Sequence, residues 1–234
     1  METPRAFCYE FLSLAFSYPY PEVVKTLQDG LGDLDRSLQA LELSYDVASL
    51  GCVLRDTHRR ILDLQGEYNT LFATALKAPS WETAYEIDKT SRRAVELADI
   101  EGFYRAFGVN LSAPIEPDSL VAELEFLSVL LQKQLYARNE GNTEGVEICQ
   151  DASRKFLTDH LGRWYEVFLR RLEEASEEEY YRYIGALLKA FLEKETQQLN
   201  GEIRTLTHYH DESAQGCTWK CEAQEGAKRT TGVR

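Results

Sequence analysis

The sequence PDSLVAELEFLSVLLQKQ, residues 117–134, predicts the central helix of this protein. Leucines recur in it every three or four positions, which places them on one face of a helix. Pro117 and Asp118 stand where the starts of helices favour them. Phe126 and its neighbours carry the apolar character around to other faces, so little of the circumference suits water. A helix of this kind is usually buried among other helices.

Two carboxylates, Glu123 and Glu125, interrupt this apolar stretch. They lie on opposite flanks of Leu124, about 100° to either side of it by helix geometry. A buried carboxylate is costly unless it is paired or hydrogen-bonded. Two interpretations stay open. Either arginines or backbone N–H groups of the same fold satisfy both acids, or at least one of them faces a groove that receives a basic ligand.

The composition indicates a soluble, all-α protein. The chain has 234 residues, 44% hydrophobic and 28% charged, which is ordinary for one globular domain. Only six prolines are present, and no run of β-branched residues alternates as strands require. We therefore expect a single helical domain of about nine to ten helices over residues 1–199. A polar hinge near 139–143 would join its N- and C-terminal sets of helices, and residues 200–234 would form an irregular tail.

Glycine predicts where two of the other helices are interrupted. Asp29-Gly30 and Gly32 predict a break after a short second helix. Residues 53–73 predict one continuous helix, which Gly66 weakens only modestly. Helical periodicity fails over residues 74–89, and this segment is predicted to be a loop.

The loop carries two aromatic residues, Trp81 and Tyr85. Loops with Trp and Tyr are often binding surfaces, because these rings combine apolar area with a hydrogen-bonding edge. The alternative is that both rings only cap the core.

The net charge of −13 restricts the partners. Acids and bases balance within residues 200–234, so the helical body carries the whole excess of negative charge. Nucleic acid and anionic membranes both favour a basic surface, and neither is expected as a partner. A basic partner fits better, unless the charge serves only to keep the protein soluble.

The five cysteines are odd in number and scattered, unlike a disulfide framework, which points to a reducing compartment. The N-terminal run FLSLAF is short and lacks a basic leader and a cleavage site. No run approaches the roughly 20 apolar residues that span a bilayer. These features predict a cytoplasmic protein.

Catalytic motifs are not found. There is no phosphate-binding glycine loop, nucleophile elbow or HExxH pattern, and of the four histidines only His160, beside Asp159, lies in a well-packed context. We therefore expect neither an enzyme nor a cofactor. The tail does hold donor types that zinc prefers, although their spacing matches no zinc template well. These candidate metal ligands are His208, His210, Cys217 and Cys221.

Several segments together resemble the TorD/DmsD/NarJ family of redox-enzyme maturation chaperones. The matching segments are EYNTLF at 67–72, LADIEGFYRAFG at 97–108, Asp118 with ELEFL at 123–127, Phe156-Leu157, and His160-Leu161 with Trp164. They keep the order of the family and cover about residues 67–164. The combination is specific, although each motif alone is weak. Ser119 departs from the pattern, because many relatives have His there, and so does Leu127, where many have Met.

The resemblance implies a chaperone dedicated to the catalytic subunit of a molybdopterin oxidoreductase. Such a protein binds the N-terminal leader of its client, often a twin-arginine signal, and delays export until the molybdopterin cofactor is inserted. The implied fold is all-helical, and its hinge permits a monomer or a domain-swapped dimer. Two other functions stay open, a metal-binding protein that uses the tail and a general helical adaptor.

The resemblance also implies a ligand region. From the family motifs it comprises Asp118, Glu123, Glu125, Phe126, His160 and Trp164. We expect acids to meet the basic part of a leader and aromatic side chains to meet its apolar part. The aromatic candidates are Trp81, Tyr85, Phe103 and Tyr104.

Overall fold

The computed structural model describes residues 2–85, 90–111, 115–197, 199 and 203–206, without the side chains of 57–59 and 90–92. These parts contain nine α-helices: α1 (Glu2–Phe16), α2 (Pro21–Ala40), α3 (Val47–Arg59), α4 (Ile61–Tyr68), α5 (Thr90–Ala106), α6 (Leu120–Asn139), α7 (Thr143–Asp159), α8 (Leu161–Ala175) and α9 (Glu179–Gln197). A π-helical turn follows α4 at Asn69–Ala73, and a 3-10 turn lies at Glu82–Ala84. Within these ranges there is no β-strand, so the all-α prediction is confirmed.

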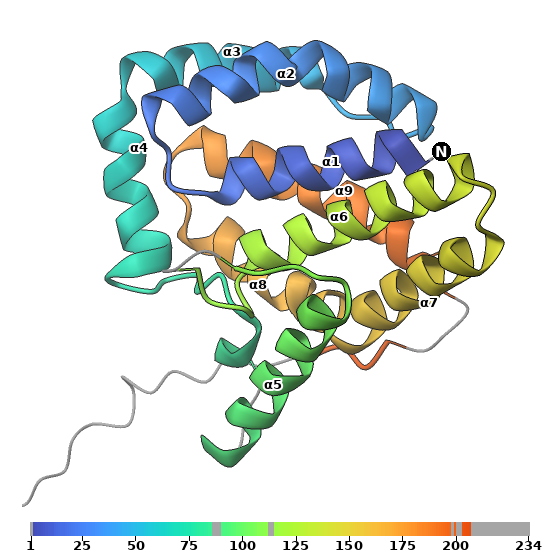
Figure 1. The fold of residues 1–234 in the computed structure, drawn as a ribbon. Helices are drawn as coiled ribbons and strands as arrows, with labels where there is room; N and C mark the ends of the chain where they lie inside the picture. Colours follow the sequence, from blue (N-terminus) through green and yellow to red (C-terminus); the bar gives the residue numbers. More distant parts are fainter. Residues whose placement is uncertain (1, 86–89, 112–114, 198, 200–202, 207–234) are drawn as a thin grey trace, which may run out of the picture.

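The helices surround α6 and α1, which pack side by side at the centre (Figure 1). Helix α9 passes behind them and contacts α1 and α3, while α2 and α3 run along one edge. Helix α7 packs against α6, and α8 follows α7 and packs against α9. Helix α5 projects from the opposite edge of the molecule (Figure 1). Its N-terminal half therefore stands partly away from the helical body.

The central helix forms as expected, although it begins at Leu120 rather than at Pro117. The hydroxyl of Ser119 caps it by accepting a hydrogen bond from the backbone N–H of Ala122 at 3.3 Å. Buried side chains lie all around α6, and Glu123 is among them, whereas Glu125 is exposed. Neighbours on several sides thus explain why its sequence has no broad polar face.

The predicted break at Asp29-Gly30 is wrong, because α2 runs unbroken from Pro21 to Ala40. The reason is tertiary packing. Val24, Leu27, Leu34 and Leu38 form one buried stripe that continues past both glycines. Burial of such a stripe outweighs the roughly 1 kcal/mol by which glycine disfavours a helix interior.

The predicted continuous helix at 53–73 is also wrong. Helix α3 ends at Arg59 and α4 begins at Ile61, with Arg60 in a non-helical conformation between them. The Arg60 side chain pairs with Asp63 and with Glu178 at 2.9 Å each. The bend allows both short helices to bury leucines in one core, which a straight rod of that length would not do. Gly66 lies inside α4 and does not interrupt it.

Two carboxylates fix α9 against the rest of the fold. Glu67, from the EYNTLF motif, accepts hydrogen bonds from the backbone N–H groups of Glu177 and Glu178, at 2.6 and 2.9 Å, just before α9. Near the other end, Glu195 accepts two hydrogen bonds from Arg5, at 2.8 and 2.6 Å, and one from the hydroxyl of Tyr9. Acids therefore anchor both ends of this helix.

The predicted hinge is a short, capped turn between α6 and α7. Gly141 has a φ of 68°, a left-handed conformation that glycine adopts freely. The side-chain oxygen of Asn142 then accepts a hydrogen bond from the N–H of Gly145 at 2.9 Å and caps α7. Domain swapping about this turn stays a prediction. None of the described helices is long and apolar enough to cross a bilayer.

Candidate functional site

The loop with Trp81 is fastened to the segment that begins α6. The N–H of Leu120 donates to the carbonyl of Ser80 at 2.8 Å, and the N–H of Glu82 donates to the carbonyl of Asp118 at 2.9 Å. The Asp118 carboxylate, itself fully buried, accepts hydrogen bonds from the N–H and the hydroxyl of Thr83, at 3.2 and 2.6 Å. Asp118 thus caps the 3-10 turn and holds the loop in place.

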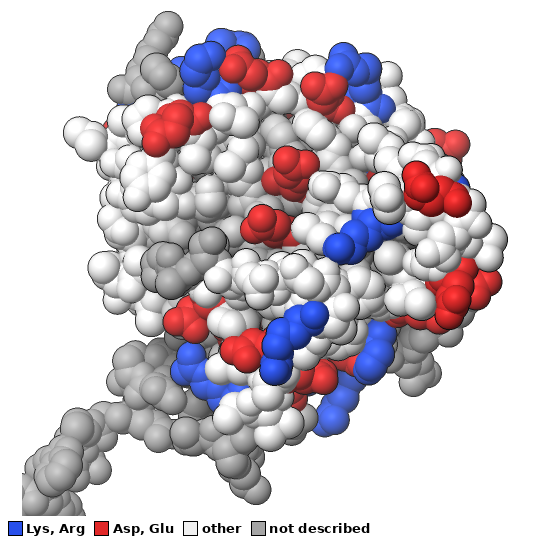
Figure 2. Space-filling view, viewed as in Figure 1, with Lys and Arg blue, Asp and Glu red and all other residues white. Residues whose placement is uncertain are grey.

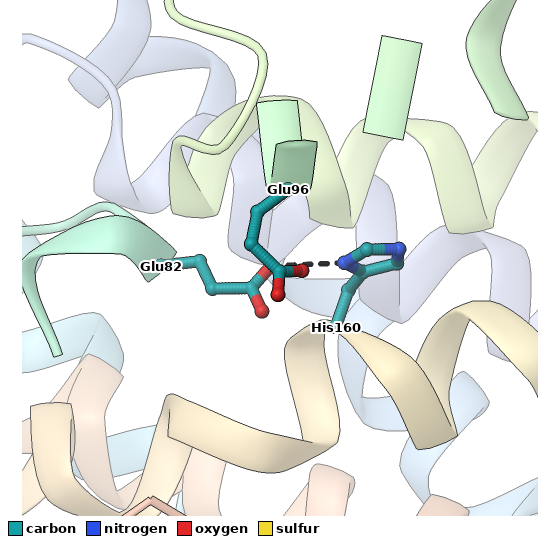
Figure 3. A group of neighbouring side chains, drawn as sticks. All are labelled: Glu82, Glu96 and His160. Atoms are coloured by element: carbon teal, nitrogen blue, oxygen red, sulfur yellow. Dashed lines mark hydrogen bonds and ion pairs between the residues drawn. The ribbon is translucent and has the colours of Figure 1, made fainter. Parts of the chain in front are cut away.

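This turn directs Glu82 into the protein, where it is fully buried. Its carboxylate lies 3.0 Å from Nδ1 of His160, at the corner between α7 and α8 (Figure 3). The Nη1 atom of Arg163, in the first turn of α8, lies 3.4 Å from the other oxygen of Glu82. A buried carboxylate therefore meets a histidine and an arginine from one helix corner.

Helix α5 adds two acids at the rim of this cluster. The carboxylate of Glu96 lies 3.7 Å from Nη1 of Arg163, and its side chain is 16% exposed. Asp99, 57% exposed, places a carboxylate oxygen 3.3 Å from Nε2 of His160, at an ion-pair distance but outside hydrogen-bond geometry. We define the acidic cluster as Glu82, Glu96, Asp99, His160 and Arg163.

The acidic cluster holds donor atoms of the kind that bind metals. One ligand atom each from Glu82, Glu96 and His160 lies within 4.8 Å of the others (Figure 3). Carboxylate oxygen and imidazole nitrogen both suit zinc. However, the Arg163 guanidinium already places positive charge beside both carboxylates, which is where a metal ion would otherwise supply it. The side chains therefore form a network compensated by the protein's own cation.

A second buried acid, Glu123, lies beside this cluster. Its carboxylate accepts a hydrogen bond from the indole N–H of Trp164 at 3.1 Å, and both side chains are fully buried. The ring of Tyr85 stacks on Trp164 at 5.6 Å, while its hydroxyl donates to the carbonyl of Pro79. The loop, α6 and α8 are thus joined through polar contacts inside an aromatic environment.

An aromatic group lies on the other side of His160. Phe126 and Phe156 pack with their ring centroids 4.8 Å apart, and the Phe156 ring lies 4.9 Å from the imidazole. Phe103 and Tyr104 of α5 contact the same rings. The hydroxyl of Tyr104 donates to the carbonyl of Pro117 at 2.7 Å. This packing fastens the C-terminal half of α5 to α6 and α7.

Buried polar atoms without a hydrogen-bond partner gather at this site. Among the described side chains, four buried polar atoms have no hydrogen-bond partner. Three of them lie here, on Asp118 (Oδ1), Glu123 (Oε1) and His160 (Nε2). An unpaired buried acceptor costs about 1–3 kcal/mol, so folded proteins rarely collect several in one place. The collection of such atoms indicates a place where an additional polar group can be accommodated.

The structure brings most of the predicted ligand residues together, but inside the protein. Those that are buried around the site are Tyr85, Tyr104, Asp118, Glu123, Phe126, His160 and Trp164. Trp81 and Phe103 are half-buried, and Glu125 is exposed on a different side of α6 from Glu123. Sequence reasoning missed Glu82, Glu96 and Arg163. Two of these residues could have been found from the sequence, because they lie next to predicted site residues. Glu82 follows Trp81, and Arg163 lies between His160 and Trp164.

Burial raises the pKa of two acids at this site, Glu123 and Glu82. Loss of hydration raises the pKa of Glu123 well above its ordinary value, and the nearby charge of Glu82 raises it further. The hydrogen bond from Trp164 acts in the opposite direction. Burial also raises the pKa of Glu82, although His160 and Arg163 oppose this shift.

The raised pKa of Glu123 predicts how a Glu123→Gln variant depends on pH. A carboxyl whose pKa is higher in the folded state stabilises the fold fully below its unfolded pKa, and this contribution is lost as the pH rises through the folded pKa. Glu123→Gln removes that loss, so we expect the variant to gain stability relative to the natural protein between about pH 4.5 and 7.5, by at most about 1.4 kcal/mol per pH unit. Urea unfolding across this range measures the difference.

The matched control is Glu125→Gln, because Glu125 lies on the same helix but is exposed. Its effect on stability should be small, because the side chain is exposed. A Glu123→Gln difference that stays constant from pH 4.5 to 7.5 would contradict the assigned pKa shift.

The predicted tail ligands His208, His210, Cys217 and Cys221 lie outside the described residues, so zinc binding there stays a prediction. The described cysteines, Cys8, Cys52 and Cys149, are free thiols.

Comparison with known proteins gives the class. Residues 21–170 match the family model described as nitrate reductase delta subunit, and the chain belongs to this family. The match confirms the resemblance to NarJ- and TorD-type chaperones that the motifs indicated. Proteins of this class are assembly chaperones rather than catalysts.

Curated relatives carry more specific descriptions. The chain is 29% identical over 209 residues to the chlorate reductase assembly chaperone of Ideonella dechloratans, covering 86% of this chain and 94% of the relative. It is 27% identical over 148 residues to the perchlorate reductase assembly chaperone of Dechloromonas aromatica, covering 61% and 64%. It is 37% identical over 99 residues to the selenate reductase assembly chaperone of Thauera selenatis, covering 40% and 50%. No solved structure matches.

Proposed function

We propose that this protein is a cytoplasmic assembly chaperone for the catalytic subunit of a molybdopterin oxidoreductase. It binds the N-terminal leader of that subunit, of twin-arginine type, and assists cofactor insertion before export. The three relatives serve reductases of chlorate, perchlorate and selenate, all of them oxyanions. We therefore infer that the client of this chain is also an oxyanion reductase.

The observation that carries the proposal is the recessed set of acids beside aromatic rings. A twin-arginine leader has a cationic part followed by an apolar part. The buried carboxylate of Asp118 and the rim carboxylates of Glu96 and Asp99 suit the first part, and the rings of Phe103 and Phe126 suit the second. One site thus offers both kinds of contact within a short distance.

The surface around the site supports recognition at the acidic cluster rather than over a broad area. Figure 2 shows acidic and basic side chains interspersed over the face that carries α1, α5 and α6. A face of mixed sign gives little selectivity for a basic segment. The carboxylates of the recessed site give more, because charges interact more strongly away from water.

Burial requires that something moves when a leader binds. Asp118 and Glu123 are fully buried, so a leader first meets the accessible rim, formed by Trp81, Glu96 and Asp99. Helix α5 is the element best placed to shift, since its N-terminal half projects from the body (Figure 1). Such a shift would give a leader access to the carboxylate of Asp118.

Affinity capture of the full chain from its native host, followed by mass spectrometry, tests the proposal. We expect the catalytic subunit of a molybdopterin reductase in the eluate. When that client is expressed without its leader, its capture should fall at least about tenfold, because the leader supplies the main contact. The control is the client with its leader intact.

Undiminished capture of the leader-deleted client would contradict leader binding and favour a helical adaptor. An eluate without any reductase subunit would contradict the chaperone function itself.

A further inference from the structure

The side chain of Lys155, in α7, lies over the aromatic ring of Phe103, in α5. Its Nζ atom is 5.9 Å from the centre of the ring, within the range at which a cation is attracted to an aromatic face. The same ammonium donates to the carboxylate of Asp159, one turn further along α7. Asp99 stands one turn before Phe103, on the same side of α5. The two helices therefore surround one cation with an aromatic ring and two carboxylates.

The surroundings of this ammonium favour positive charge. The pKa of Lys155 is raised, first by its hydrogen bond to Asp159 and further by the negative charges of Asp159 and Asp99, while loss of hydration opposes the shift. Asp99 also places an oxygen 3.3 Å from Nε2 of His160, a buried atom without a hydrogen-bond partner. The imidazole meets the Phe103 ring edge to face at 5.7 Å. This place can thus accommodate a larger polar group than the ammonium it holds.

Lys155 can leave this position at little cost. Its side chain is 63% exposed, and those of Asp159 and Asp99 are 38% and 57% exposed. Ion pairs and cation–π contacts at such exposure contribute little to stability and are screened by salt. The Phe103 ring is held independently, because it packs edge to face on the buried ring of Phe156 at 5.3 Å. The ring therefore stays in place when the ammonium moves into water.

We define the cation site as the ring of Phe103 with the carboxylates of Asp99 and Asp159. We propose that the cation site receives an arginine of the client leader, and that Lys155 occupies it until a leader binds. This inference rests on the proposed function and deepens it by naming the first contact of the cationic part. The apolar part of the leader would follow from the Phe103 ring toward Phe126, whose ring lies 6.4 Å away.

The cation site favours arginine over lysine in the leader. A guanidinium is planar, so it can lie flat on an aromatic ring while its N–H groups reach carboxylates at the edge. An ammonium is a compact point charge that is more strongly hydrated, and it gains less from the ring. Exchange of a lysine for an arginine also leaves the net charge of the site unchanged. The leader therefore gains a better contact than the one it displaces.

Calorimetric titration with two synthetic leader peptides tests the proposal. One carries Ser-Arg-Arg ahead of an apolar stretch of about 12 residues, and the other has Ser-Lys-Lys in its place. For Lys155→Gln we expect the Arg-Arg peptide to bind about fivefold more tightly than it binds the natural chain, since no internal cation competes. For Lys155→Arg we expect about threefold weaker binding, because an internal arginine competes better. The position is exposed, so both variants should fold.

The matched control for Lys155→Gln is Arg154→Gln. It removes the same charge from the preceding residue, which is exposed and pairs with Asp151. Its affinity for either peptide should change by less than about twofold. An equal gain in both variants would mean that only the net charge matters, and the cation site would be wrong.

Phe103→Leu supplies a second measurement, because it keeps an apolar side chain but removes the aromatic face. It should reduce the preference for Arg-Arg over Lys-Lys by about threefold or more. Phe107→Leu is its control, since Phe107 is also half-buried on α5 and packs on Phe126. That variant should keep the preference.

Two negative results have different meanings. If the natural chain binds the Arg-Arg peptide but the Lys155 variants and Phe103→Leu behave like it, leader binding stands and the cation site is wrong. If the natural chain binds neither peptide, the leader-binding function itself is contradicted, and this inference is contradicted with it.

Discussion

Replacing Phe156 by alanine is expected to destabilise the protein by about 3–5 kcal/mol. Phe156 is fully buried in α7, and its ring contacts those of Phe103, Tyr104, Phe126 and His160. The substitution removes a large apolar side chain, and the surrounding rings come from α5, α6 and the corner between α7 and α8, which cannot collapse together without shifting. Urea unfolding followed by circular dichroism measures the loss.

The matched control is Ile148→Ala, which lies in the same helix and is 52% exposed. It should change stability by no more than about 0.5 kcal/mol. A similar small effect of Phe156→Ala would mean that the aromatic group is not a rigid part of the core, and the position assigned to α5 would then be wrong.

A methyl group at Gly162 is expected to cost about 3 kcal/mol, because this glycine stands where α8 turns away from α7. A Cβ atom built there would overlap the backbone carbonyl oxygen of Leu157, and it would also press on the side chain of Ile203 at 3.2 Å. The carbonyl belongs to α7 and cannot rotate away as a flexible side chain can. Relief requires that α8 moves, which would displace His160 and Arg163 from Glu82.

Gly66→Ala is the matched control for Gly162→Ala. Gly66 also lies inside a helix, but a Cβ atom there meets nothing within 4 Å. Alanine is the better helix former, so this variant should gain about 0.5–1 kcal/mol. If both variants shift the urea midpoint in the same direction, the tight contact assigned to Gly162 is wrong.

Much of the fold could be predicted from local sequence. The leucine repeat after Asp118 predicted the central helix, because a helix that is apolar on every side has few alternatives to burial. The two wrong predictions concern continuity. Gly30 and Gly32 are weak helix formers, yet α2 continues because its buried stripe continues, and Arg60 marks a bend that no glycine or proline announces. Propensity is a local quantity, and in both places long-range packing outweighed it.

The candidate site was predicted in part. The motifs and the family resemblance selected Asp118, Glu123, His160 and Trp164, and these four do lie together. Glu96 escaped notice because an acid on a partly exposed helix looks like any solvated residue. Its role depends on the orientation of α5 over the helix corner, which no spacing along the chain contains.

By itself, the sequence determined an all-helical, acidic chain whose central helix must be buried. It also showed that the two acids on that helix require either a partner or contact with solvent. It also determined the family, through motifs whose order is specific. Only the tertiary structure decided that Glu123 accepts a hydrogen bond from the buried indole of Trp164 and that Glu125 faces solvent. It also decided that Glu82 lies beside Arg163. The physical reason is that periodicity along a helix fixes which side chains share a face, whereas the partners of a buried charge come from segments that meet only when the whole chain has folded.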